Sequence, residues 1–386
     1  MKPLAGIRVI DVTTNISGPT LTMILADLGA EVIKVEKPDG DEARKMEPRL
    51  AEDGVYFLNI NRQKKSITLN VKNASELQQL HQLVQTADVF VENYREGISE
   101  KLKLDYQTLK RLNSKLIYCS LSAYGIHGPK KSFPGYDAIM QAETGIISVT
   151  GSEEIARVPV SLIDQGSAMW GALGVVSAIF QRLQTQEGCF VSTSLYETGV
   201  FWSNYHLLST KLTGENPEKL GSNHGAFAPY GTFQTLDGAV MIGISNNKLF
   251  EKLCDVLQKS EWVKDEQYCT NEQRVKHRKQ LNEKIEQLTK QISSEALVRS
   301  LETSGVPVAK VKTMEDVLKD PQQKENRLII SLPHKRDGQM YATRLPLTFS
   351  SCDITPTIAA PMLGEHNEEI LRKDSERCIF LSQSFH

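Results

Sequence analysis

Short apolar strands alternate with helices through the first 122 residues, and this alternation constrains the fold more than any other feature. Each strand segment is rich in β-branched residues and is bounded by turn residues, which is typical of buried strands. The strands are expected at residues 6–12, 31–36, 67–71, 89–94 and 116–122. Because parallel strands need crossover connections, the pattern predicts a doubly wound, mostly parallel, Rossmann-like α/β domain.

The pattern changes in the middle of the chain. Helices are expected over 164–183 and 194–213, and a joint rich in Gly, Asn and Pro follows at 213–231. A hairpin is expected at 232–244, followed by charged helices and a strand at 306–311. This order of elements predicts a second, smaller α+β domain.

Composition excludes several classes of protein. The 386 residues are 40% hydrophobic and 24% charged, which suits a globular protein with a sizeable core. A net charge of −2 argues against a nucleic-acid partner. No apolar stretch reaches the ~18 uninterrupted residues of a membrane span, and the first residues do not resemble a signal peptide. We therefore expect a cytoplasmic protein.

The cysteines and histidines show no metal-binding pattern. Both residue types are dispersed, and the cysteines form no C-x-x-C pair, so no metal site is expected. We expect reduced and mostly buried thiols in a cytoplasmic protein. The cysteines are Cys119, Cys189, Cys254, Cys269, Cys352 and Cys378.

The first strand–helix turn, TTNISGPT at 13–20, lies where an α/β fold would bind a dinucleotide. It contains one glycine and lacks the G-x-G-x-x-G run that lets a backbone approach a pyrophosphate, which argues against NAD. Pro19 suits the first turn of a helix, where its missing N–H costs nothing. We interpret Glu36, at the end of the second strand, as a solvated charge.

A basic stretch, NRQKKSITLNVK at 61–72, contains no acidic residue. Its cations are Arg62, Lys64, Lys65 and Lys72. They could hold the phosphates of a nucleotide-like ligand. The alternative is a solvated turn between strands, and charge alone favours this alternative over a phosphate site.

A single carboxylate, Asp164, separates the run VPVSLI from a long apolar helix. An acid at a helix start is most often a structural cap. However, the small or polar residues 165–168 leave room for a ligand, and free N–H groups at the helix start would lower the pKa of Asp164 and stabilise an oxyanion. A carboxylate so placed can attack an activated carbonyl. Upstream, Tyr136 follows a Pro-Gly turn and is expected to be half-buried.

Taken in order, these segments resemble the class III coenzyme A transferases, which include formyl-CoA transferase, carnitine CoA-transferase and α-methylacyl-CoA racemase. The resemblance covers nearly the whole chain. The matching motifs are LAGIRVIDVTTNISGP, LADLGAEVIKVEKPDGD, NRQKKSITLNVK, ADVFVENYREG, GYDAIMQAETG, VPVSLIDQGSAMWGALGVVSAI, APYGTFQTLDG and PMLGEHNEEIL.

The resemblance implies a reaction between an acyl-CoA and a carboxylic acid that needs no cofactor. Asp164 matches the catalytic aspartate, which forms a mixed anhydride and then an aspartyl-CoA thioester. The basic stretch would then meet the CoA phosphates, and Lys37 would lie near the adenine end. The positions that match coenzyme A-binding residues are Thr14, Ile16, Ser17, Lys37, Leu69, Lys72, Asn93, Tyr94, Arg95, Lys101 and Tyr136.

Family resemblance also implies an interlocked homodimer with a large and a small domain. The large coenzyme A-binding domain is expected over 1–200 and the linker over 201–228. The small domain is expected over 229–325, and a return segment at 326–386 completes the large one.

Departures from the family pattern bear on the reaction. Racemases carry a His where this chain has Tyr136, and a phenol of pKa near ~10 is a poor base at neutral pH. Ile16 replaces the catalytic-turn Gln of formyl-CoA transferase, and GSNHGAFAP at 221–229 is shorter than that enzyme's glycine-rich loop, which argues against oxalate as acceptor. Residues 221–228 are hypothesised to cap the active site.

Two alternatives stay open beside the transferase. One is a racemase-like isomerase that uses Asp164 with another base. The other is a nucleotide-binding protein without activity.

Overall fold

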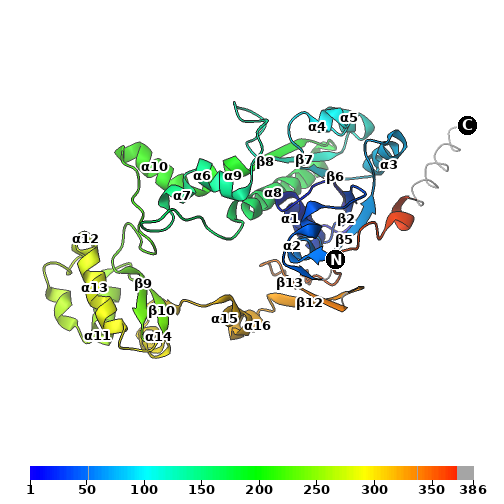
Figure 1. Cartoon of the computed structure of the whole chain (residues 1–386). Helices are drawn as coiled ribbons and strands as arrows, with labels where there is room; N and C mark the ends of the chain where they lie inside the picture. Colours follow the sequence, from blue (N-terminus) through cyan, green and yellow to red (C-terminus); the bar gives the residue numbers. More distant parts are fainter. Residues whose placement is uncertain (51, 337, 372–386) are drawn as a thin grey trace, which may run out of the picture. The chain divides into compact units, whose positions relative to one another are not determined.

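The computed structural model describes residues 1–50, 52–336 and 338–371 (Figure 1). The chain forms two compact units. The first contains Met1–Ile146, Val158–Leu208 and the segment from Gln322, and the second contains Ile147–Arg157 and Ser209–Pro321. The boundaries therefore differ from the expected ones: residues 147–157 belong to the second unit, which resumes at Ser209, inside the expected linker, and ends at Pro321. Cys378 and the end of the return segment lie outside the described residues.

Within the described residues, six parallel strands form the sheet of the first unit. Their order is β5-β2-β1-β6-β7-β8. They are β1 (Arg8–Asp11), β2 (Glu31–Glu36), β5 (Lys64–Thr68), β6 (Val89–Glu92), β7 (Ile117–Ser122) and β8 (Phe190–Ser194). The predicted parallel α/β sheet is confirmed, and its order reverses between β1 and β6. β8 was not predicted, because its Ser- and Thr-rich sequence lacks a continuous apolar run.

Helices cover both faces of this sheet (Figure 1). Val9 packs toward the face with α1 (Ser17–Asp27) and α8 (Leu162–Thr185). Its neighbour Ile10 packs toward α3 (Ala74–Gln85) and α5 (Tyr106–Leu112). Because both faces of the sheet are covered, the central strands are mainly apolar along their whole length, with exceptions such as Lys34 in β2.

α1 and α8 pack closely because small residues lie between them. A Cβ atom at Gly171 would lie 2.2 Å from Leu21 Cδ1. α8 is also long and apolar enough to cross a membrane by length and composition alone. Half of its most apolar window is buried inside the protein, as in a core helix, so this length is weak evidence for a membrane.

Smaller elements complete the first unit. They include η1 (Glu42–Lys45), β3 (Arg49–Leu50), β4 (Asp53–Gly54), α2 (Val55–Ile60), α4 (Ile98–Lys101), α6 (Asp137–Glu143), α9 (Leu195–Trp202) and the antiparallel hairpin of β12 (Ile329–His334) and β13 (Gly338–Thr343). The helix expected over 194–213 is broken at Ser203 into α9 and α10 (Asn204–Thr213). The β12–β13 hairpin buries Leu332 and Met340 against Phe57.

The return segment is attached to the outer strand β5. His366 donates its N–H to the Ser66 carbonyl (2.9 Å), and the Asn367 side chain accepts the N–H of Thr68 (2.8 Å). Residues 367–371 are helical. These bonds satisfy backbone groups that an edge strand would otherwise expose.

The second unit has its own sheet and core. β9 (Tyr230–Thr235) and β10 (Gly238–Gly243) form the predicted hairpin, and β11 (Val308–Lys310) pairs antiparallel with β10. The helices are α7 (Ile146–Val149), α11 (Asn247–Val256), η2 (Ser260–Lys264), α12 (Asn271–Lys276), α13 (Arg278–Thr289), α14 (Ser294–Thr303), α15 (Met314–Lys319) and α16 (Pro321–Glu325). Two of these, α7 and α16, span unit boundaries, as does α10. Phe233, Phe250 and Leu281 are buried in its core.

The described cysteines are all free thiols. Cys119 and Cys254 are buried, Cys189 and Cys352 are half-buried, and Cys269 is exposed. Reduced thiols agree with the expectation, but fewer of them are buried than expected.

We predict that Gly188→Ala destabilises the first unit. A Cβ atom there would lie 2.1 Å from the Leu116 carbonyl oxygen, so the backbone at the start of β8 must move. The free energy of unfolding, measured by urea denaturation, should fall by about 1–3 kcal/mol. Glu187→Ala, at the adjacent exposed position, is the control and should change it by less than about 0.5 kcal/mol. Equal stability of both variants would contradict the close approach.

Candidate active site

The predicted ligand-binding residues follow four neighbouring strands. Thr14–Ser17 follow β1, Lys37 follows β2, Leu69–Lys72 follow β5, and Asn93–Arg95 follow β6. Because all four strands are parallel, their carboxyl ends lie at one edge of the sheet, which is where open α/β sheets bind ligands. The topology therefore brings these residues to one edge.

A pair of hydrogen bonds joins the two loops at the point where the strand order reverses. The Asn93 side chain accepts the Thr14 N–H (3.1 Å) and donates to the Thr14 carbonyl (2.9 Å). Asn93 therefore binds the protein's own turn through its amide. Glu92, buried beside it, accepts the Tyr94 N–H at 2.6 Å, and burial raises the pKa of Glu92 to about 7.

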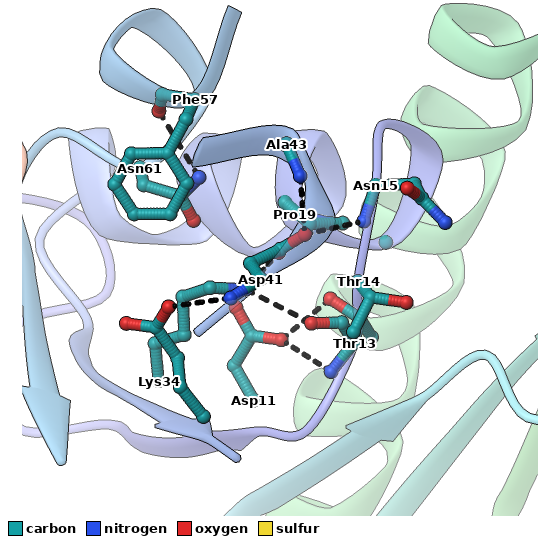
Figure 2. Close-up of polar contacts among 12 residues, drawn as sticks. Asp11, Thr13, Thr14, Asn15, Pro19, Lys34, Asp41, Ala43, Phe57 and Asn61 are labelled. Atoms are coloured by element: carbon teal, nitrogen blue, oxygen red, sulfur yellow. Dashed lines mark hydrogen bonds and ion pairs between the residues drawn. The ribbon is translucent and has the colours of Figure 1, made fainter. Parts of the chain in front are cut away.

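Buried charges lie beneath the β1 turn (Figure 2). Asp11 accepts hydrogen bonds from Thr13 and Thr22 and forms an ion pair with Lys64 at 3.1 Å. Burial raises the pKa of Asp11, but Lys64 and Lys34 outweigh it and hold that pKa below its usual range. Burial lowers the pKa of Lys64 to about 8.

Glu36 and the basic stretch do not lie where they were expected. Glu36 is buried and forms an ion pair with Arg44 (2.7 Å), so its interpretation as a solvated charge is wrong. Arg62 and Lys64 are also buried, paired with Asp27 (2.6 Å) and Asp11, and cannot reach a ligand's phosphates. They belong to β5 and the segment before it, whose inward positions lie against carboxylates on α1 and β1.

The remaining predicted cations differ in their partners. Lys37 is paired with Glu42 at 2.7 Å, and that hydrogen bond raises the pKa of Lys37. Within the described residues, Lys72, Arg95 and Lys101 are exposed and have no carboxylate partner. These three are therefore the cations free to bind phosphate. Leu69 is buried, so only its backbone could meet a ligand.

Asp164 lies in the first turn of α8, at the third helical residue rather than at the cap. It is 8% exposed. Within the described residues its carboxylate accepts no hydrogen bond and forms no ion pair. Because α8 leads into β8, a parallel strand, the start of α8 lies at the carboxyl edge of the sheet.

The start of α8 is capped by a carboxylate from another helix. Asp137, in α6, accepts the N–H of Ile163 (2.7 Å) and that of Asp164 (3.2 Å). The Gln141 side chain donates to the other Asp137 oxygen at 2.6 Å. This role could not be predicted from local sequence, because Asp137 is 27 residues from Asp164 and its cap forms only in the tertiary structure.

Two expectations about Asp164 are therefore wrong. The N–H groups of residues 162–165 all have partners, in Val160, Asp137 and Ser161, so none is free for an oxyanion. Burial, together with the nearby Asp137 carboxylate, raises the pKa of Asp164 to about 7 instead of lowering it.

The small residues after Asp164 do not leave room for a ligand. A Cβ atom at Gly166 would lie 2.6 Å from the Trp202 indole nitrogen, and Ser167 donates to Thr198 at 2.8 Å. Ala168 is fully buried. The side of α8 that carries residues 166–168 is occupied by α9 and the core, so the expected room is wrong for these three residues, whereas Gln165 is exposed. Tyr136 is 68% exposed rather than half-buried.

Known proteins resemble this chain over almost its whole length. The sequence description of CoA-transferase family III matches residues 4–367. The chain belongs to CoA-transferase family III. A relative from Mus musculus named succinyl-CoA:glutarate CoA-transferase is 33% identical over 380 residues, covering 97% of this chain and 86% of the relative.

Two further proteins support the membership of family III. The succinate–glutarate CoA-transferase of Agrobacterium fabrum is 31% identical over 96% of this chain and 95% of its own length. A crystal structure of a CaiB/BaiF family protein from Brucella suis has a TM-score of 0.88 and 32% identity, covering 97% of this chain and 99% of that one. The predicted enzyme class and the α/β fold of family III are confirmed.

We predict that Asp164→Asn changes how stability depends on pH. The folded pKa of about 7 exceeds the ~3.9 of a free Asp, so the native state holds more protons between these values. The contribution of Asp164 to the free energy of unfolding is therefore fully present below pH 4 and is lost as pH rises through 7. Relative to the unmodified chain, the variant should gain about 2–4 kcal/mol between pH 4.5 and pH 8 in urea denaturation.

The matched control for that experiment is Asp353→Asn. Hydrogen bonds from Thr355 hold the pKa of the exposed Asp353 below its usual range. Its removal should therefore cause a small relative loss, not a gain, as pH rises. If the effect of Asp164→Asn on stability did not depend on pH, this would contradict a buried Asp164 carboxyl group with a raised pKa.

Proposed function

We propose that this family III enzyme moves coenzyme A from an acyl-CoA to a carboxylic acid through a covalent intermediate on Asp164. The observation that supports this most directly is a buried carboxylate at the carboxyl edge of the sheet that has no ion pair or hydrogen bond among residues 1–50, 52–336 and 338–371. A pKa raised to about 7 means that the protonated and the ionised forms of Asp164 are both populated near neutral pH. An ionised carboxylate that is buried without hydrogen-bond partners is more basic and more nucleophilic than a carboxylate hydrated by water.

In the first half of the reaction, an Asp164 oxygen attacks the thioester carbon and the C–S bond breaks. This step gives a mixed anhydride and free CoA thiolate. The thiolate then attacks the Asp164 carbonyl, the anhydride C–O bond breaks, and the donor leaves as a carboxylate. Asp164 is now an aspartyl-CoA thioester.

The second half reverses these steps with the acceptor. Its carboxylate attacks the Asp164 carbonyl, and CoA thiolate leaves as a second anhydride forms. The thiolate then attacks the acceptor's carbonyl carbon, which gives the new acyl-CoA and frees Asp164. No net oxidation and no redox cofactor are required.

Coenzyme A would lie along the carboxyl ends of β5, β2, β1 and β6. The exposed Lys72, Arg95 and Lys101 suit its phosphates, and the turn at Thr14–Ser17 and the backbone near Leu69 would contact the rest. Tyr136, exposed next to Asp137, would border the acyl group. The names of two relatives favour a dicarboxylate such as glutarate as the acceptor to test first.

The proposed enzyme is a cytoplasmic, interlocked homodimer. An exposed apolar stripe along α8 suits burial by a second copy. Met169, Leu173, Phe180 and Leu183 make up this stripe, and their exposed fractions all exceed one half.

We predict that Asp164 becomes covalently modified during turnover. Incubation with succinyl-CoA and hydroxylamine, followed by peptide mass spectrometry, should find a hydroxamate at residue 164. Borohydride should instead reduce the activated carboxyl to an alcohol. Asp164→Ala should give no adduct and should lower the rate of acceptor-dependent exchange by at least ~10³-fold, because nucleophile removal has effects of this size.

Asp353→Asn is the control and should exchange thioesters at the rate of the unmodified chain. An Asp164→Ala variant that exchanges at full rate, or an adduct at another residue, would contradict the proposed mechanism.

We further predict that a 2-methylacyl-CoA incubated in deuterated water gains no α-deuterium while glutarate-dependent exchange proceeds. Racemisation needs a base on each face of the α-carbon, and the Tyr136 phenol is a poor base at neutral pH. Mass spectrometry of the thioester measures the deuterium, and chromatography of the acyl-CoA products measures the exchange. Deuterium gain without any acceptor requirement would favour the racemase-like alternative.

A further inference from the structure

The turn after β1 is held by side chains rather than by glycines. Thr13 donates its N–H to Asp11 (2.9 Å), and its carbonyl accepts from Lys34 Nζ (2.9 Å). The N–H and the carbonyl of Thr14 both bind Asn93. Asn15 donates its N–H to Asp41 Oδ1 (3.1 Å). Five backbone groups in three residues are therefore fixed by four side chains from different parts of the unit. Figure 2 shows three of these side chains, Asp11, Lys34 and Asp41.

Lys34 and Asp41 contact each other, so the two hydrogen bonds that they make to the turn are linked. Their side chains are fully buried and form an ion pair at 2.8 Å. Lys34 lies within an apolar strand, β2, and Asp41 also caps η1 by accepting the Ala43 N–H (3.0 Å). Although burial lowers the pKa of Lys34, Asp41 and Asp11 raise it above its usual range, so it stays charged.

Burying the Lys34–Asp41 pair costs free energy, so the stability of the fold does not by itself explain why the pair is there. A buried ion pair is often no more stable than apolar residues of similar size, because both charges lose their hydration. Asn15 also adopts a left-handed backbone (φ 65°), which costs free energy for a residue with a side chain, although less for Asn than for most others. A strained turn that the surrounding structure over-determines is typical of a functional site.

We propose that the Lys34–Asp41 pair is a positioning device that fixes the 13–15 turn in the conformation that receives coenzyme A. This inference rests on the proposed function, which places the coenzyme at Thr14–Ser17. Lys34 donates to the Thr13 carbonyl, and Asp41 accepts the Asn15 N–H, so the pair binds the turn on both sides of Thr14. The two charges attract each other, so a shift of either end of the turn disturbs the other. The turn thus stays ordered without the glycine run of nucleotide-binding loops.

The test measures the dissociation constant of free coenzyme A for the full chain by calorimetry. Lys34→Met keeps roughly the length of the side chain but removes its charge and its hydrogen bond to the Thr13 carbonyl. It should weaken coenzyme A binding by about 10-fold or more, the effect of one lost charge-assisted hydrogen bond. At saturating acyl-CoA, kcat should change by less than about 3-fold, because Lys34 touches no reacting atom.

Asp41→Asn is a milder second variant. It keeps an oxygen for the Asn15 N–H but lacks the charge that attracts Lys34, so it should weaken binding in the same direction and by less. It decides the question if Lys34→Met does not fold. A further readout is amide hydrogen exchange of the peptide covering 13–17 without coenzyme A, which should be faster in both variants.

Asp27→Asn is the matched control. It breaks another buried ion pair of the same unit, with Arg62 at 2.6 Å, that does not touch the turn. It should lower the midpoint of urea denaturation as Lys34→Met does, with coenzyme A affinity and exchange of the 13–17 peptide within about 2-fold of the unmodified chain.

Folded Lys34→Met or Asp41→Asn protein with unchanged affinity and unchanged exchange would overturn the inference, as would an equal loss of affinity in Asp27→Asn. Coenzyme A binding and the adduct at Asp164 are separate readouts. Absence of the adduct therefore contradicts the proposed mechanism alone. An unmodified chain that binds no coenzyme A would overturn both.

Discussion

Charges buried beneath the carboxyl ends of β1, β2 and β5 determine how this chain can use its sheet. Asp11 and Asp41 face Lys64 and Lys34 at 3.1 and 2.8 Å, so the interior charges balance. Each group also binds backbone or hydroxyl partners, which offsets part of its lost hydration. Removing one member would leave an uncompensated charge in the core, so these residues must be satisfied together.

The same physics acts with the opposite result at Asp164. Asp11 is buried among cations, which lower its pKa and keep it ionised. Asp164 is buried beside another carboxylate, and its pKa is raised to about 7. Asp137 has a second effect, since it binds the N–H groups that would otherwise stabilise the Asp164 anion. A carboxylate deprived of such partners remains reactive, which is the property the proposed reaction requires.

Much of the fold could be predicted because its signals are local. The strands β1, β2, β6 and β7 are short apolar runs bounded by turns, and the β9–β10 hairpin follows from its alternation and turn residues. Asp164 and the residues after β1 and β6 could be predicted as site candidates. The roles of Lys34 and Glu36 could not be resolved, although a lysine between apolar strand residues signals a buried, paired charge.

The order of amino acids alone predicts the parallel α/β sheet, the long apolar helix α8 and the family, because these depend on periodicity and on motifs in a fixed order. Which charged side chains are free to bind a ligand depends on the tertiary structure. Arg62 and Lys64 resemble Lys72 in sequence, yet the first two face carboxylates 35 and 53 residues away and Lys72 faces solvent. It also decided the ionisation of Asp164, because burial and Asp137 outweigh the helix end. Desolvation and pairing depend on what lies nearby in space, and no local pattern records that.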